Sequence, residues 1–416
     1  IMKNSLHLFI ISIVILLAAV RTVPVMAQDP LDYQQPPDAI IKLVDAPVTP
    51  SVQVGPYNDI MLLLENQGLP AIEELAAEEL RLAGIRFNPN TNGPSRRSHN
   101  TGITIMNIDG SGSREVSGLP TDAALRNFSW SPDGKKIAFT HTSTEGIELW
   151  MLDIEQARAM QLSGPVINDI LGSPLSWMPG SDAIIYKMIP ENRGPAPARP
   201  NVASGPNIME SYGRRAAVRT FQDLLNDQYD EEIFDYYTSA RLMRTDTEGN
   251  SEPVWGPGVI WGFDVSPDGN FIRLTTLQKP YSYIVPYNRF AQRYEIINAE
   301  GDQIRIIADI PVTEEIPQGF GASREGPRSL SWRSDAPATL FWAEALDGGD
   351  PSVEAEYRDQ VLFMEAPFDG EAVEAFKTTY RFSGIDWGKE DLALLNEFWR
   401  PTRMARLSSF DPRDPS

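Results

Sequence analysis

The chain has 416 residues, of which 36 are Lys or Arg and 57 are Asp or Glu, giving a formal net charge of −21. With 42% hydrophobic residues it can bury a core, which excludes wholesale disorder. The acidic balance opposes binding to nucleic acid or anionic lipid, because both require a basic footprint. The sequence contains no cysteine, which excludes disulfides and thiolate chemistry.

The first residues are typical of a secretory signal. Lys3 precedes an almost unbroken apolar run at residues 6–20, and residues 25–27 offer a cleavage site that ends in Ala27. Residues 1–27 are therefore predicted to be a signal peptide that directs the chain to the periplasm or the extracellular space. The alternative is an uncleaved N-terminal membrane anchor, because the uncharged run at residues 4–20 reaches the lower edge of a bilayer span. We expect membrane contact only through this segment.

Residues 28–50 are rich in proline and are predicted to be a linker segment. A strand–turn–strand pattern then recurs along the chain. Its clearest copy is FSWSPDGKKIAF at residues 128–139, where Trp130 ends an aromatic strand and Pro132, Asp133 and Gly134 supply a tight turn. Proline presets φ, aspartate bonds back to the backbone, and glycine tolerates positive φ. Degraded copies keep the tryptophan or the Asp-Gly pair, at Trp177, Asp268, Gly269, Trp332 and Trp387.

A second type of hairpin, turning at Asp-Gly or Glu-Gly pairs, lies between these copies. Two hairpins make a four-stranded unit of about 40 to 50 residues, which is the period of propeller blades. Residues 51–416 are therefore predicted to form an all-β domain, a β-propeller with about six four-stranded blades of an incomplete seven- or eight-bladed propeller. The alternative, a β-sandwich, leaves the recurring turn unexplained. We expect a helical insertion near residues 219–237, while residues 73–83 fit either a helix or a strand.

The sequence has no Gly-x-Ser-x-Gly nucleophile elbow, no His-Glu-x-x-His and no phosphate-binding glycine loop. It therefore predicts no catalytic residue, no metal site and no cofactor. His99 and His141 are interpreted as packed or surface histidines. Four acidic residues lack the spacing of a calcium loop and are interpreted as a solvated loop: Asp347, Asp350, Glu354 and Glu356. Six more are interpreted as the solvated face of the expected helix: Asp223, Asp227, Asp230, Glu231, Glu232 and Asp235.

Isolated basic residues are unusual in so acidic a chain. Arginine can bind a carboxylate through two parallel hydrogen bonds, so the basic islands are candidate contacts for acidic substrate groups. These candidates are Arg193, Arg214, Arg219, Arg403 and Arg406. Neighbouring tyrosines could wall a pocket: Tyr212, Tyr281, Tyr283 and Tyr287. The alternative for any single arginine is ordinary ion pairing.

Several long stretches are distinctive, among them YQQPPDAIIKLVDAPVTP (33–50), LAGIRFNPNTNGPSR (82–96), VRTFQDLLNDQYDEEIFDYY (218–237) and LSWRSDAPATLFWAEALDGGD (330–350). In this order they resemble the N-terminal part of the glutamyl endopeptidases, a branch of the prolyl oligopeptidase family of serine peptidases. The resemblance runs from about residue 32 to residue 410.

The resemblance implies a β-propeller that caps and helps to select peptide substrates for an α/β-hydrolase domain, which carries a Ser-Asp-His triad and cleaves after Glu. None of the triad maps onto this sequence, so we expect the chain alone to be inactive and to be part of a longer protein. The alternative is a stand-alone periplasmic propeller that acts as a protein- or peptide-interaction module.

Overall fold

A computed structural model describes residues 35–200, 220–388 and 391–414. The chain divides into two compact units, Ile1–Pro47 and Val48–Ser416. In the first unit, helix α2 (Asp38–Val44) has no buried residue. The predicted signal peptide and the candidates Arg214, Arg219 and Tyr212 lie outside the described residues. Within the described ranges, no helix is both long enough and apolar enough to cross a membrane.

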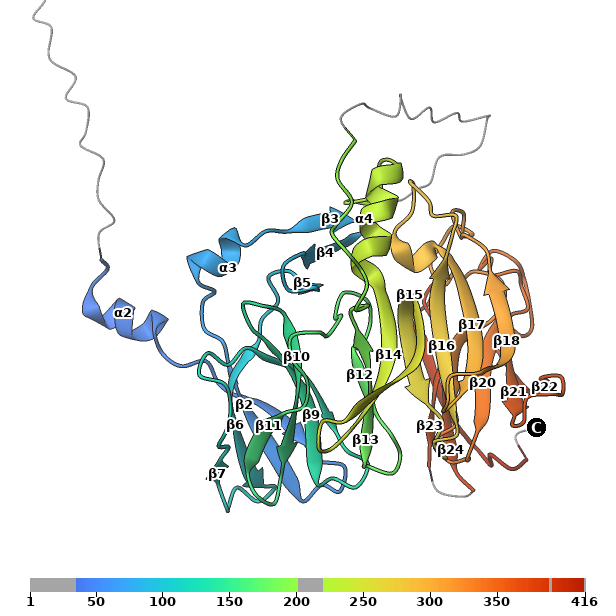
Figure 1. Cartoon of the computed structure of the whole chain (residues 1–416). Helices are drawn as coiled ribbons and strands as arrows, with labels where there is room; N and C mark the ends of the chain where they lie inside the picture. Colours follow the sequence, from blue (N-terminus) through green and yellow to red (C-terminus); the bar gives the residue numbers. More distant parts are fainter. Residues whose placement is uncertain (1–34, 201–219, 389–390, 415–416) are drawn as a thin grey trace, which may run out of the picture. The chain divides into compact units, whose positions relative to one another are not determined.

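The second unit consists almost entirely of antiparallel strands in six consecutive blades (Figure 1). Blade 1 contains β1 (Ser51–Val54), β2 (Ile60–Asn66), β6 (Asn100–Asn107) and β7 (Arg114–Glu115). Blade 2 contains β8 (Leu125–Trp130), β9 (Lys136–Thr142), β10 (Ile147–Asp153) and β11 (Arg158–Gln161). Blade 3 contains β12 (Leu175–Trp177), β13 (Ala183–Met188), β14 (Ser239–Asp246) and the first part of β15 (Ser251–Val265). Blade 4 contains the rest of β15, β16 (Phe271–Gln278), β17 (Ala291–Asn298) and β18 (Gln303–Ile310). Blade 5 contains β19 (Arg328–Trp332), β20 (Thr339–Ala345), β21 (Asp359–Glu365) and β22 (Val373–Thr378). Blade 6 contains β23 (Arg381–Trp387), β24 (Ala393–Trp399) and β25 (Met404–Phe410). The predicted fold class and six blades are confirmed, although blade 6 has three strands in the described chain.

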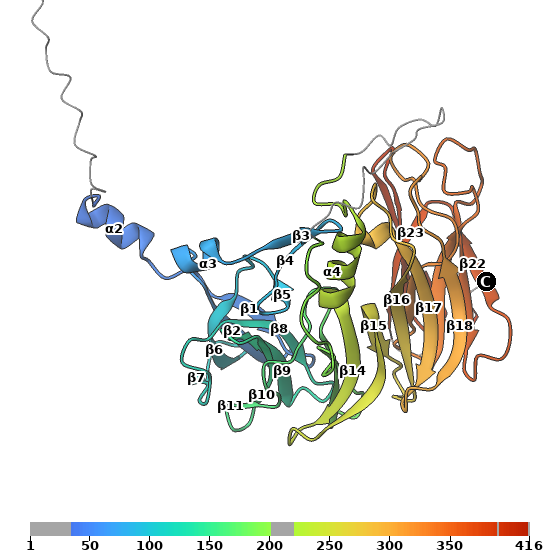
Figure 2. The same ribbon diagram turned by 45° about the horizontal axis from the view of Figure 1, so that its top comes forward.

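Some blades are also continuous with one another through backbone pairing. β15 pairs with β14 along its first part and with β16 from Ile260 to Val265, so one strand closes blade 3 and opens blade 4. The turned view shows β14 to β18 as one twisted row (Figure 2). Blades 1 and 2 are joined by the pair of Asn100 on β6 with Leu125 on β8 and by a parallel bridge between Ser117 and Arg158. Blades 3 and 4 are therefore the more firmly connected pair.

The predicted turn after the first strand of blade 2 is confirmed. Ser131 Oγ donates to Asp133 Oδ1 at 2.6 Å, and the same oxygen accepts a hydrogen bond from the Lys135 amide at 3.1 Å. Gly134 has a φ of +66°, a left-handed conformation that glycine adopts without a Cβ penalty. In blade 4, residues 266–270 repeat the two bonds at 2.6 and 3.0 Å. The polar residues of the motif therefore serve the turn itself.

The tryptophan before this turn joins consecutive blades. Trp177 Nε1 donates to the Ser129 carbonyl of blade 2 at 2.9 Å. In the same way, Trp332 Nε1 of blade 5 donates to the Asp264 carbonyl of blade 4 at 3.2 Å. The first strands β8, β12 and β15 also contact one another. First strands therefore lie side by side on the inner side of the propeller.

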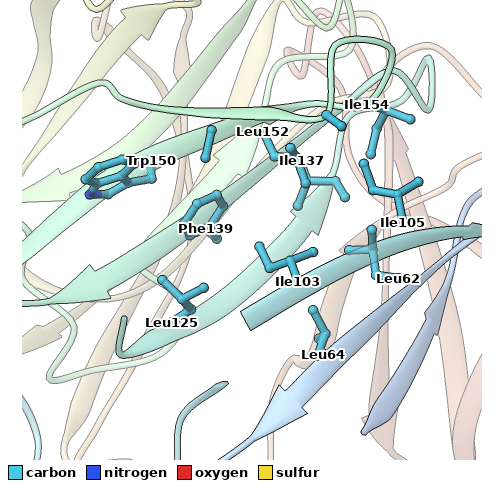
Figure 3. Packing of buried hydrophobic residues seen from close by; sticks show 12 residues of the cluster. Leu62, Leu64, Ile103, Ile105, Leu125, Ile137, Phe139, Trp150, Leu152 and Ile154 are labelled. Atoms are coloured by element: carbon cyan, nitrogen blue, oxygen red, sulfur yellow. The ribbon is translucent and has the colours of Figure 1, made fainter. Parts of the chain in front are cut away.

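Five buried clusters each combine residues of two consecutive blades. In the first cluster, Leu62 and Ile105 of blade 1 pack against Ile137, Phe139 and Leu152 of blade 2 (Figure 3). The other four repeat this arrangement between blades 2 and 3, 3 and 4, 4 and 5, and 5 and 6. One face of each of blades 1 to 5 is therefore covered by the next blade along the chain. Among the described residues, none of these clusters joins blade 6 to blade 1.

The expected helix is shorter than the predicted range. Helix α4 spans Gln228–Thr238, and Asp227 caps its N-terminus by accepting a hydrogen bond from the Asp230 amide. The described residues before Asp227 are irregular, so the helix prediction is wrong for them. The ambiguous stretch at residues 73–83 contains both alternatives, since α3 (Ile72–Ala76) is followed by β3 (Leu80–Leu82).

The bond between blades can be tested by replacing Trp177 with Phe. The replacement removes the hydrogen bond to the Ser129 carbonyl, so we expect the free energy of unfolding in urea to fall by about 1–2 kcal/mol more than in Trp130→Phe. Trp130 is the matched control because its Nε1 is buried and has no partner among the described residues. Equal losses in the two variants would contradict a role for the bond.

Candidate functional site

Three insertions that pack against one another emerge from the same end of the blades. Each lies between the second and third strands of its blade: residues 67–99 in blade 1, 189–238 in blade 3 and 279–290 in blade 4. Second strands stop and third strands start at one end of an antiparallel blade, which we call the insertion end. Figure 1 shows β3, β4 (Ile85–Asn88), β5 (Gly93–Pro94) and α4 together at this end.

Strands β3 to β5 form a small sheet, residues 80–94, which we call the strap. Its tip is a hairpin turn at Ala83 and Gly84, whose φ angles of +52° and +82° fit a type I′ turn. The Gly84 amide donates to the Asp223 carbonyl and the Tyr287 amide donates to the Ala83 carbonyl, each at 2.8 Å. Arg86 Nε also pairs with the Asp223 carboxylate at 2.6 Å. The strap thus leaves blade 1 and is fastened to the insertions of blades 3 and 4.

Apolar packing holds the three insertions together. One buried cluster contains Ala83 and Phe87 of the strap, Phe234 of α4, and Tyr281 and Phe290 of the blade 4 insertion. The rings of Phe234 and Tyr281 meet edge to face, with centroids 5.2 Å apart. Since blades 1, 3 and 4 all contribute, this cluster covers part of the insertion end rather than the side of a single blade.

The structure places the candidate Arg193 beside the end of α4. Its Nη1 donates to Asn92 Oδ1 of the strap at 2.7 Å, and its guanidinium lies 4.4 Å from the ring centroid of Tyr236. Asn92 is buried, and its Nδ2 donates to the Tyr237 carbonyl at 2.9 Å. Arg193 therefore connects the strap to the blade 3 insertion.

The candidates Arg403 and Arg406 lie elsewhere, in blade 6. Arg403 is exposed in the turn between β24 and β25. Arg406 Nη1 donates to Thr379 Oγ1 at 3.1 Å, and its guanidinium lies 5.0 Å from the ring centroid of Tyr380. The described contacts of these two arginines do not include Arg193, so the structure does not assemble them into one site.

The predicted solvated face of the helix is wrong for two of its residues. Asp223 precedes α4 and serves the strap tip, and Asp230 is buried, where Oδ2 accepts from the Asn226 amide at 2.9 Å. Two candidate tyrosines also bind the carboxylates of α4: Tyr281 donates to Asp235, and Tyr283 donates to Glu231. These tyrosines fasten the blade 4 insertion to the helix.

A charged cluster lies at the insertion end around Asp169, a buried residue of the link between blades 2 and 3. Asn127 Nδ2 donates to Asp169 Oδ2 at 2.9 Å, and Arg126 Nη1 lies 3.8 Å from the same oxygen. Burial raises the pKa of Asp169, whereas the Asn127 hydrogen bond and the charges of Arg126, Lys187 and Arg97 lower it. The cluster therefore holds three cations around one carboxylate.

Another ionic cluster joins blades 5 and 6. Asp347 is buried and accepts hydrogen bonds from Arg358 Nη1 at 2.9 Å and Arg381 Nη2 at 2.8 Å. Arg381 Nη1 also bonds Asp359 Oδ1 at 2.9 Å, and Arg328 pairs with Asp359. The interpretation of Asp347 as part of a solvated loop is therefore wrong, because Arg358 at the other end of this loop and Arg381 of β23 enclose it.

Arg126 and Arg328 occupy equivalent positions that sequence reasoning missed. Arg126 is the second residue of β8 in the segment RNFSW, and Arg328 is the first residue of β19 in the segment RSLSW. Each is followed by a residue with left-handed φ, Asn127 at +55° or Ser329 at +56°. The pairing register shifts at both places, which is a β-bulge. Bulges redirect side chains at the rims of sheets. The arginine that recurs before the marker tryptophan is the sequence signal that could have identified both residues.

His141 is packed, as predicted. Its Nδ1 accepts a hydrogen bond from the Ala124 amide at 3.2 Å, and burial lowers its pKa. Burial also lowers the pKa of His99. In the part of the chain that the structure describes, no group of three or more His, Asp or Glu side chains is arranged to hold a metal ion.

Comparison with known proteins gives two similar curated sequences. The chain is 36% identical over 398 residues to a protein named "Probable glutamyl endopeptidase, chloroplastic" from Oryza sativa subsp. japonica, covering 92% of this chain and 42% of that protein. The identity is 36% over 394 residues to a protein of the same name from Arabidopsis thaliana, covering 91% and 41%. No family model matches the chain.

Among solved structures, an acylaminoacyl peptidase in complex with Z-Gly-Gly-Phe-chloromethyl ketone is similar, with a TM-score of 0.44 and 11% identity over 88% of this chain and 45% of that one.

The consecutive blades and their neighbouring first strands define a β-propeller. The chain belongs to the glutamyl endopeptidase family. It spans about two fifths of the length of the curated relatives that it matches.

Lys187 of the charged cluster provides a test by pH. Burial lowers its pKa from 10.5 to about 8, and Asp169 opposes this shift. Between pH 8 and 10 the unfolded chain keeps a proton that the folded chain has lost, so the Lys187 contribution to the free energy of unfolding rises with pH. We expect wild type to gain about 1–3 kcal/mol over Lys187→Met between pH 7.5 and 9.5, measured by urea unfolding.

The control is Lys279→Met, because the hydrogen bond to Asp235 raises the pKa of Lys279 above 10.5. The contribution of Lys279 to the free energy of unfolding therefore does not change with pH in this range. A flat or falling difference for Lys187→Met would contradict burial of the ammonium group.

Proposed function

We propose that the chain is the substrate-selecting propeller portion of an exported glutamyl endopeptidase-like serine peptidase. The observation that carries the proposal is the 36% identity over nearly the whole chain to proteins with that name, of which the chain spans only part. In this proposal the catalytic serine belongs to an α/β-hydrolase domain, and the propeller receives peptides or unfolded polypeptides. The apolar run at residues 6–20 supports export to the periplasm or the extracellular space.

The strap supports a role in controlling access. It is rooted in blade 1, yet its tip is held by the insertions of blades 3 and 4 through two backbone hydrogen bonds and one ion pair. Opening the tip would also have to release Ala83 from the buried apolar cluster, but it would break no strand ladder of a blade. Arg193, which binds the strap through Asn92, and the exposed Arg403 remain candidates for contact with acidic substrate groups.

Exposed apolar residues support docking of a second domain at the insertion end. Leu69, Ile72 and Leu75 of the blade 1 insertion are exposed, and so is Phe320 in the loop before blade 5. Exposed apolar groups that gather at one face of a protein often mark an interface. The proposed partner is the α/β-hydrolase domain of the longer protein.

Because the sequence holds no nucleophile elbow, we expect the purified chain to leave a chromogenic Glu-containing peptide uncleaved. Release of the chromophore that a serine-directed inhibitor abolishes would contradict the proposal. The nucleotide sequence downstream distinguishes the peptidase from the stand-alone interaction module. A continuous reading frame that encodes a Gly-x-Ser-x-Gly motif supports the peptidase, and the absence of such a frame supports the interaction module.

The strap contact can be tested with Arg86→Gln. Loss of the ion pair with Asp223 should raise hydrogen exchange of the Gly84 and Tyr287 amides roughly two- to five-fold, because both amides donate across the tip. Arg81→Gln is the matched control, since Arg81 pairs with Glu79 inside the same insertion at 2.8 Å. Equal exchange in the two variants would show that the ion pair does not hold the tip.

A further inference from the structure

We propose that Arg97 and Arg126 form a binding site for a carboxylate side chain of an acidic polypeptide segment at the insertion end. The inference rests on the proposed function, in which the propeller receives polypeptides, and adds where and by which groups an acidic segment is held. The site differs from the candidates chosen by charge contrast, because Arg193 and Arg406 already bind neighbouring side chains.

The first argument is the local excess of positive charge. Arg126 Nη1 lies 3.8 Å from Asp169 Oδ2, and the charges of Arg97 and Lys187 also lower the pKa of the Asp169 carboxyl. The cluster therefore carries a surplus of two positive charges in a chain whose formal net charge is −21. Lys187 is buried and donates to a backbone carbonyl. Only the two arginines are accessible to a ligand.

The second argument is that Arg126 has donors to spare. Its Nη1 lies 3.8 Å from Asp169, which is beyond hydrogen-bonding distance, and Asp169 Oδ2 is already bonded to Asn127. Among the described residues, no hydrogen bond from the Arg126 side chain is present. Arg381 shows the opposite arrangement, because it bonds two carboxylates and two backbone carbonyls. Of these two arginines at the starts of first strands, Arg126 is the one able to bind a new partner.

The third argument is the surroundings of Arg126. Its side chain is 22% exposed, so the guanidinium is partly removed from water and yet reachable. Burial lowers its pKa, although an arginine stays charged at neutral pH. A charge pair is stronger in such a partly desolvated place than on an open surface. A carboxylate bound at Arg126 would therefore gain more binding free energy than a carboxylate bound at the exposed Arg403.

Arg97 supplies the second, exposed cation. It follows the strap in the chain, and its charge acts on Asp169, on Arg126 and on Tyr287 of the blade 4 insertion. None of the ion pairs among the described residues includes Arg97. Two neighbouring arginines repel each other, and an anion between them relieves this repulsion.

The chemistry favours a peptide carboxylate over other anions. Nucleic acids and anionic lipid surfaces carry many negative charges, and a protein with a net charge of −21 repels them. A neutral peptide with a single acidic side chain is repelled only weakly, and its carboxylate matches the geometry of a guanidinium.

The test compares two fluorescent, unstructured peptides of Gly, Ser and Ala that differ in one central residue, Glu or Gln. Fluorescence anisotropy measures their dissociation constants with the full chain. We expect the Glu peptide to bind about 5- to 20-fold more tightly, and Arg97→Gln and Arg126→Gln each to remove most of that difference. Arg158→Gln, an equal charge change at an exposed position on β11, should leave it unchanged.

Equal binding of the two peptides would overturn the carboxylate site while leaving peptide capture by the propeller intact. Binding of neither peptide would contradict the proposed function itself, and the carboxylate site with it. A loss in Arg97→Gln no larger than in Arg158→Gln would also overturn the site. Arg97 is exposed, so this variant keeps the test valid even if Arg126→Gln fails to fold.

Discussion

The structure depends on contact between the first strands of consecutive blades. The second strand β13 is buried along its whole length, so both faces of its blade need a cover. A single four-stranded sheet cannot supply this cover, but the next blade can. The hydrogen bonds from the indole of Trp177 to the Ser129 carbonyl and from the indole of Trp332 to the Asp264 carbonyl fix the spacing between consecutive blades. The loops at the insertion end are held in place by this stack of sheets.

The propeller could be predicted because its signal is local. Trp130, Asp133 and Gly134 act within one turn or against the adjacent strand, so the motif keeps its meaning wherever it recurs. Even the degraded copies keep the backbone shape: Asn58 and Ser181 adopt left-handed φ of +56° and +60° where blades 2 and 4 have glycine. Asparagine tolerates this conformation well, which explains why the sequence can vary there.

The insertions could not be predicted in the same way, because their structure comes from contacts between distant segments. The irregular stretch before α4 is set by Asp223, which is held by the strap more than a hundred residues earlier in the chain. Asp347 looked solvated in sequence, yet Arg381 of β23, together with Arg358 of its own loop, encloses it.

The choice of candidate arginines had the same weakness, because charge contrast along a sequence does not reveal the partner of a side chain. Arg193 lies on the Tyr236 ring and bonds Asn92, whereas Arg126, next to an ordinary strand motif, keeps free donors. A repeat-aware alignment of RNFSW with RSLSW identifies Arg126 as a rim residue, but only the structure shows that Asp169 is too far away to saturate it.

The strand β15 has a mechanical consequence. It belongs to blade 3 at its start and to blade 4 at its end, so a hinge between these blades would have to bend one continuous strand or break two hydrogen-bond ladders. The tip of the strap is fastened to the insertions of these two blades. Blades 3 and 4 are thus coupled into one half, to which the tip of the strap is fastened, and any breathing of the propeller is directed to the seams on either side of this half.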